Sequence, residues 1–156
     1  MRVVIRIVEH TIYLFLIAIL IAATITDIRE RIIYDRFILI GLAFTLLFRS
    51  FYRSEPWWEY IGTGVGVFLV LFTIAVITNE NSIGGGDVKL FAVIGLGLGW
   101  ELFLAVFFLS HLLAGLWLLG VKMIRWHEVN RKTTLPFAPF ILIGMIAVYL
   151  VSVNYG

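Results

Sequence analysis

The sequence predicts an all-α fold, a polytopic membrane helix bundle of about six transmembrane helices. Of the 156 residues, 62% are hydrophobic and 14% are charged, and the mean hydropathy is +1.03. A soluble domain carries roughly a quarter charged residues, and a small globule cannot hide so much apolar surface in its own core. The length suits one domain, so we expect a single membrane-embedded domain over residues 1–156.

Six apolar runs, separated by charged or Gly/Pro-containing breaks, predict the helices. A spanning helix needs about 20 residues, with a range near 17–25. The first, third, fifth and sixth runs fit this length, the second is marginal, and the fourth is too short to cross alone. The runs lie near 10–27, 36–52, 59–78, 87–99, 101–121 and 135–153. The first has no small-x-small cleavage site before Asp27, so we interpret it as a retained span and not as a signal peptide.

Glycines in the third and fourth runs predict close helix packing, because small residues let helix backbones approach each other. An alternative joins the fourth and fifth runs into one element that is broken around Gly99. The glycines concerned are Gly62, Gly64, Gly66, Gly95, Gly97 and Gly99.

Basic residues indicate how the bundle is oriented. With six spans, eight of the twelve lysines and arginines fall in three loops on one side. The positive-inside rule then places these loops in the cytoplasm and both termini outside. Asp27 and Asp87 lie on the same, cytoplasmic side. The eight residues are Arg29, Arg31, Arg36, Lys89, Lys122, Arg125, Arg131 and Lys132.

Several kinds of chemistry are disfavoured by composition. The chain has no cysteine, which excludes disulfides, thiol nucleophiles and CxxC zinc pairs. Its histidines, His10, His111 and His127, are scattered, so we expect no metal and no cofactor. His111 is expected to hydrogen-bond a neighbouring helix. The net charge of +2 is mild and its basic residues serve topology, so we expect no nucleic-acid partner.

Two aspartates border the apolar runs. A charge beside lipid is costly, so Asp27 is a functional candidate, although an aspartate at a helix end is often only a solvated loop residue. Asp87 follows Gly84, Gly85 and Gly86, whose flexible backbone would let another chain come close. The alternative for Asp87 is an ordinary helix N-cap.

As a pair, the aspartates predict acid–base chemistry. Two carboxylates held close together cannot easily both ionise, so they share a proton. One can activate a water while the other holds a proton for a carbonyl oxygen, which splits an amide without a metal or a thiol. We expect Asp87 to be the ionised member, because it starts a helix and has Lys89 nearby.

Three segments resemble the signatures of the type IV prepilin peptidase family. Asp27 lies six residues before Ile33-Tyr34-Asp35, as in the family's Ile-Pro-Asn or Ile-Pro-Asp turn; Gly84-Gly85-Gly86-Asp87 followed by Lys89 is similar to its Gly-x-Gly-Asp motif; and Pro136-Phe137-Ala138-Pro139-Phe140 resembles the start of its last span. Tyr34 replaces the usual proline, and Ala138 replaces the usual glycine.

The resemblance implies a membrane aspartic endopeptidase that removes the leader of pilin-like precursors at the cytoplasmic face of a prokaryotic plasma membrane, in pilus assembly or secretion. It assigns catalysis to Asp27 and Asp87 and a supporting or substrate-binding role to Gly84, Gly85, Gly86 and Lys89. The expected partners are prepilin-like substrates and the lipid bilayer. The family's paired CxxC motifs are absent, so the implied form is the short one, without the methyltransferase part. The sequence indicates no oligomeric state.

Two alternatives remain. A presenilin-type protease also uses Gly-x-Gly-Asp, but it places a Tyr-Asp pair inside a span, whereas Tyr34-Asp35 lies in a predicted loop. A small membrane transporter or channel component would use the aspartates for protons or ions, and composition alone does not separate it from a peptidase.

Overall fold

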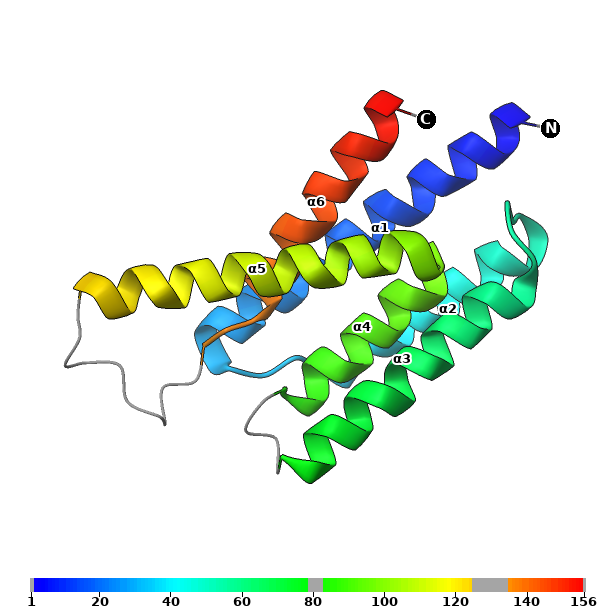
Figure 1. Cartoon of the computed structure of the whole chain (residues 1–156). Helices are drawn as coiled ribbons and strands as arrows, with labels where there is room; N and C mark the ends of the chain where they lie inside the picture. Colours follow the sequence, from blue (N-terminus) through cyan, green and yellow to red (C-terminus); the bar gives the residue numbers. More distant parts are fainter. Residues whose placement is uncertain (1, 79–82, 125–134, 156) are drawn as a thin grey trace.

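The computed structural model describes residues 2–78, 83–124 and 135–155 and is helical in every regular element of this part of the chain. The predicted all-α class is confirmed, and each of the six predicted helices is present (Figure 1). Arg125, His127, Arg131 and Lys132 lie outside the described residues. The helices are α1 (Arg2–Glu30), α2 (Asp35–Phe51), α3 (Trp57–Ile77), α4 (Gly85–Leu98), α5 (Trp100–Ile124) and α6 (Ala138–Tyr155).

Within the part of the chain that the structure describes, three helices are long and apolar enough to cross a bilayer, over Arg6–Glu30, Trp57–Ile77 and Trp100–Ile124. They identify the chain as an integral membrane protein. The sixth run forms α6, whose 18 residues (Ala138–Tyr155) fall at the short end of the range for a spanning helix, and its part over Ala138–Asn154 is an apolar helix shorter than the three spans. Residues 135–137 are not helical, because Pro136 disfavours helical geometry at the residue before it.

The short helix α4 lies at the centre of the bundle. It packs against α1, α2, α3 and α5, and nine of its fourteen residues are buried, among them Val88, Phe91 and Ile94. A helix that is apolar all round is stable when its neighbours cover it. The length of α4 is therefore no obstacle, because its surface meets protein and not lipid.

Close packing of α3 on α4 depends on one glycine of each helix. Gly64 lies against Leu96, and Gly95 lies against Thr63 and the Cα of Gly64. The prediction for Gly62 and Gly66 is wrong, since a Cβ on either would meet nothing within 4 Å. Residues two apart point to nearly opposite sides of a helix, so only the middle glycine of the three can face α4.

We predict that Gly64→Ala destabilises the bundle and Gly62→Ala does not. At position 64 the new Cβ would lie 2.8 Å from the Leu96 Cβ and 3.1 Å from the Ala92 carbonyl oxygen, an overpacking that costs about 1–3 kcal/mol. At position 62 alanine gains about 0.5–1 kcal/mol from its better helix propensity. Thermal unfolding in detergent measures both, and equal midpoints for the two variants would contradict this packing.

A single residue separates α4 from α5. Gly99 has φ 78° and ψ 179°, and at this φ a side chain would be strained. Figure 1 shows α5 turning back from this point across the bundle, so the fourth and fifth runs are two distinct helices and not one interrupted element.

The chain termini and the two aspartates lie toward opposite ends of the bundle. Both termini, the α2–α3 connection and the turn at Gly99 lie toward one end (Figure 1). Asp27, in the last turn of α1, and Asp87, in the first turn of α4, lie toward the other. The prediction that the aspartates share one side is confirmed.

Candidate active site

Asp27 is a buried carboxylate at the end of a long span. It is 8% exposed and lies one turn before Arg31, whose N–H donates to the Asp27 carbonyl oxygen at 3.1 Å. Arg31 has φ 58°, the left-handed conformation with which many helices end. The chain therefore leaves α1 just beyond Asp27, and the Asp27 side chain stays inside the bundle.

The carboxylate of Asp27 receives a hydrogen bond from a helix 111 residues away. The backbone N–H of Ala138, the first residue of α6, donates to Asp27 Oδ2 at 3.0 Å. The first N–H groups of a helix have no partner within the helix, and such an end attracts a carboxylate. Ala138 is fully buried. The interaction requires only a backbone group, so alanine serves as well as glycine at this position.

Asp87 is the third residue of α4 and not its N-cap. The N-cap is Gly84, which has no side chain to do the capping, and the Gly84 N–H instead donates to the Asp87 carboxylate. This is the returning half of a capping box, so part of the ordinary helix-capping interpretation is correct. The other oxygen, Oδ1, is buried without a hydrogen-bond partner among the described residues.

The surroundings of Asp87 favour its protonated form. The residue lies at the start of α4, outside the three helices that are long enough to span. Burial first, and then the negative charge of Asp27, raise the pKa of Asp87 from 3.8 to about 7, while the Gly84 hydrogen bond lowers it. The expectation that Asp87 is the ionised member of the pair is therefore not supported, because burial and a like charge raise its pKa and act against the helix terminus.

Lys89 does not neutralise Asp87. Its Nζ lies 2.6 Å from Oδ1 of Asp35, the first residue of α2, and both side chains are substantially exposed. Such a surface pair contributes about 0–1 kcal/mol. Lys89 thus links α4 to α2 beside the aspartates. Asp35 occupies the last position of the first signature, but nothing in the sequence marks it as the partner of Lys89.

The two aspartates are held near each other by a glycine contact. A Cβ on Gly86 would lie 2.9 Å from the Cβ of Ile33, so only glycine lets the α1–α2 connection pack onto the start of α4 at this distance. A Cβ on Gly84 would lie 3.3 Å from Asp87 Oδ2. The space beside Gly86 is thus filled by the protein's own chain.

Tyr34 reproduces the turn that a proline would make. It is the N-cap of α2 with φ −72° and ψ 135°, within the range to which a proline ring restricts φ. Its hydroxyl donates to Oε2 of Glu30. The replacement of proline therefore leaves the path of the chain after Asp27 compatible with the motif.

An aromatic cluster supports the loop that holds Ala138. Phe137 lies next to His111, with ring centroids 4.9 Å apart, and His111 lies 4.1 Å from Phe107. His111 Nδ1 lies 2.8 Å from the carbonyl oxygen of Phe107, which belongs to the same helix. This contact is not the predicted hydrogen bond to a neighbouring helix. The cluster packs α5 against the segment before α6.

Chemically, this site can hold one proton between two carboxyl groups. Among the described residues, no group of three His, Cys, Asp or Glu side chains is arranged to bind a metal ion. The site offers a buried carboxylate on Asp27 and a buried, unpartnered oxygen on Asp87. Such a pair can transfer protons to and from a water or a carbonyl oxygen.

We predict that Gly86→Ala impairs the site more than it impairs the fold. The added methyl group would meet Ile33 and push the α1–α2 connection away from α4, which misplaces the aspartates. A 1 Å misplacement can cost about 10²-fold in rate. A turnover assay compared with the unfolding midpoint measures this, and a normal rate with Gly86→Ala would show that the contact is irrelevant.

We predict that Asp87→Asn removes a pH dependence of stability. A carboxyl with a raised pKa stabilises the fold fully below its unfolded pKa near 3.9, and this contribution is lost as the pH rises through about 7. The loss is on the order of 4 kcal/mol for the wild type at high pH. Unfolding midpoints of both proteins between pH 4 and pH 9 test this; parallel curves would contradict it.

Comparisons with known proteins match this chain to a protein family and to several relatives. A model of the type IV leader peptidase family matches residues 14–119, a stretch that contains both aspartates. The chain is 37% identical over 134 residues to a Bacillus subtilis (strain 168) protein named prepilin leader peptidase/N-methyltransferase. The matched region is 86% of this chain and 53% of that protein.

Proteins of the same name from Aeromonas salmonicida (strain A449) and Pseudomonas putida are each 30% identical, over 86% and 83% of this chain and 47% and 46% of their own lengths. The chain therefore spans about half the length of these relatives. No solved structure matches the chain.

Proposed function

Because this chain belongs to the type IV leader peptidase family, we propose that it is a membrane aspartic endopeptidase that removes the leader peptide of type IV pilin-like precursors. Asp27 and Asp87 are its catalytic residues. The relatives are named prepilin leader peptidase/N-methyltransferase. For this chain we infer only the peptidase activity. The enzyme acts as one domain over residues 1–156.

One observation carries the proposal. Asp87, with a pKa raised to about 7 by burial and by Asp27, combines a proton-holding carboxyl with a buried Oδ1 that has no partner among the described residues. A helix cap needs neither the second carboxylate nor the burial. A pair that shares a proton is the arrangement used for metal-free peptide hydrolysis.

In the proposed reaction, Asp27 acts as general base and Asp87 as general acid. Asp27 takes a proton from a water whose oxygen attacks the scissile carbonyl carbon, and Asp87 gives its proton to the carbonyl oxygen. The resulting diol collapses when Asp27 passes its proton to the amide nitrogen and the C–N bond breaks; Asp87 takes back the proton from the diol. The pair titrates jointly, so both apparent pKa values belong to it.

The chain backbone supports the assignment of the base. Ala138 N–H donates to Asp27 Oδ2, and in the proposed reaction Oδ1 is the oxygen that takes the proton from the water. Gly84 and Gly86 support the site, because a Cβ on either would crowd Asp87 or Ile33, and Lys89 pairs with Asp35 beside the aspartates.

We place the active site at the cytoplasmic face of the plasma membrane. By their order in the sequence, eight of the twelve basic residues fall in the loops that the six-span topology assigns to the aspartate side. Of the four on the other side, Arg49 is 5% exposed and paired with Glu9, so it is a packing group and not a topology signal. The bias toward the aspartate side is thus larger than the count alone indicates.

Co-expression with a pilin-like precursor tests the proposed function. Removal of the leader increases the precursor's gel mobility, and mass spectrometry locates the cut. We expect processing with the wild type and none with Asp27→Asn/Asp87→Asn. Asp35→Asn, a matched carboxylate on the same face outside the pair, should retain most of the activity. Processing by the double variant would exclude Asp27 and Asp87 as the catalytic residues, whereas no processing by the wild type would favour the transporter or channel alternative.

A further inference from the structure

A polar cavity lies at the opposite end of the bundle from the aspartates. It has a volume of about 570 Å³ and is formed by residues of α1, the α2–α3 connection, and the ends of α3, α4, α5 and α6. Tyr13 lines it, and Asp27 lies fourteen residues further along the same helix, about 21 Å away at 1.5 Å per residue. The proposed peptidase mechanism makes no use of this cavity.

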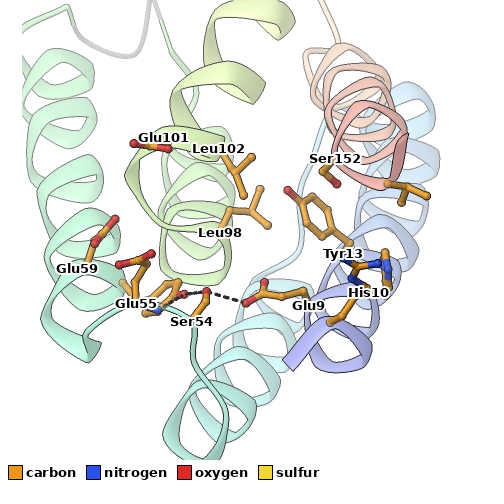
Figure 2. A pocket seen from close by; sticks show the side chains of 13 residues that line it. Glu9, His10, Tyr13, Ser54, Glu55, Glu59, Leu98, Glu101, Leu102 and Ser152 are labelled. Atoms are coloured by element: carbon orange, nitrogen blue, oxygen red, sulfur yellow. Dashed lines mark hydrogen bonds between the residues drawn. The ribbon is translucent and has the colours of Figure 1, made fainter. Parts of the chain in front are cut away.

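The cavity is strongly acidic. Four glutamates line it, against one arginine, Arg6. Glu9 is already engaged by Arg49 and by the Ser54 hydroxyl, and Figure 2 shows the contact with Ser54. Glu59 and Glu101 lie in the first turns of α3 and α5, where a helix favours acids without any ligand. The four are Glu9, Glu55, Glu59 and Glu101. Acidity alone therefore does not identify a site.

Tyr13 supplies independent evidence for a ligand. Its side chain is 3% exposed, and its hydroxyl is buried with no hydrogen-bond partner among the described residues. The Ser152 hydroxyl beside it donates to the Tyr149 carbonyl oxygen at 2.9 Å and does not meet ordinary hydrogen-bond geometry with Tyr13. Figure 2 shows the Tyr13 hydroxyl pointing into the space toward Leu98 and Leu102. A buried hydroxyl without a partner is costly, so a group that fills this space and bonds to it would be favoured.

The position of the cavity indicates where such a group comes from. Trp57, Trp58 and Trp100 lie at the starts of α3 and α5, at this end of the bundle, and each is more than half exposed. Exposed tryptophans at span ends mark the level of lipid headgroups. Leu98, Leu102 and Val153 add apolar wall to the acidic rim.

We propose that this cavity binds the ammonium group of an aminophospholipid headgroup. The ammonium donates to the carboxylates of the rim and to the Tyr13 hydroxyl, while the apolar wall meets the carbon atoms beside it. A trimethylated headgroup has no N–H to donate and is larger, so the cavity discriminates against phosphatidylcholine. This site is independent of the proposed peptidase activity.

Native mass spectrometry of the full chain in detergent tests the proposal. With equal phosphatidylethanolamine and phosphatidylcholine added, we expect at least about tenfold greater retention of the ethanolamine lipid, the ratio that corresponds to one charge-assisted hydrogen bond. Tyr13→Phe removes only the hydroxyl and should lower this preference several-fold. Tyr52→Phe, an exposed tyrosine outside the cavity, should leave it unchanged.

Two results would overturn the proposal. Equal retention of the two lipids by the wild type would show that the cavity does not recognise an ammonium group, whatever the variants do. Displacement of the ethanolamine lipid by spermidine at similar concentration would show that the cavity takes soluble amines and not a lipid headgroup.

Discussion

Asp27→Asn and Asp87→Asn should each lower the rate of leader removal by about 10²–10⁴-fold, the usual contribution of a general acid or base. Asparagine keeps the shape of the side chain but cannot exchange a proton. Asp27→Asn can still accept the Ala138 N–H, and Asp87→Asn keeps an oxygen for the Gly84 N–H, so the fold should survive. Single-turnover processing of a purified precursor in detergent measures the rates.

The pH profile separates the two roles. If Asp87 must hold the proton, the wild-type rate should fall as the pH rises above about 7, the pKa to which burial and Asp27 raise this carboxyl.

The loss of rate in the double variant should be similar to the loss in each single variant, because the two groups act as a unit. A single variant that retains wild-type rate while it remains folded would remove that aspartate from the mechanism.

Arg49→Ala should lower the free energy of unfolding by about 3–5 kcal/mol, the cost of breaking a buried ion pair. Arg49 Nη1 and Nη2 bind Glu9 Oε1 and Oε2 at 2.5 and 2.7 Å, and its Nε donates to the Gly97 carbonyl oxygen at 3.0 Å. The guanidinium also lies 4.1 Å from the ring centroid of Tyr60. One side chain of α2 thus connects α1, α3 and the last turn of α4.

Three further variants identify the cause of that loss. Arg49→Lys should recover little stability, because a lysine cannot bind Glu9 with two parallel hydrogen bonds. Glu9→Gln in the Arg49→Ala background should recover part of it by removing the unpaired charge. Arg53→Ala, an exposed arginine four residues away, should change stability by less than about 0.5 kcal/mol. Similar losses for Arg49→Ala and Arg53→Ala would contradict a buried pair.

The local sequence around Asp87 did not predict which of the two aspartates holds the proton. Asp87 was expected to be ionised because a helix start and Lys89 are close in the sequence. In the folded chain Lys89 pairs with Asp35, 54 positions away, and Asp87 faces Asp27 in a buried site. Burial and a like charge come from distant segments, and they outweigh the local terms.

The sequence by itself determined the all-α class, the six helices, the shared side of the aspartates and the family signatures. These properties depend on hydropathy along the chain and on residue order, which are one-dimensional. Only the tertiary structure decided which glycine of α3 meets α4, that Ala138 N–H binds Asp27, that Arg49 is buried against Glu9, and that Tyr13 faces an acidic cavity. Each of these depends on how far a helix is rotated about its own axis and on which distant segment packs beside it, because a shift of one residue turns a side chain by about 100°.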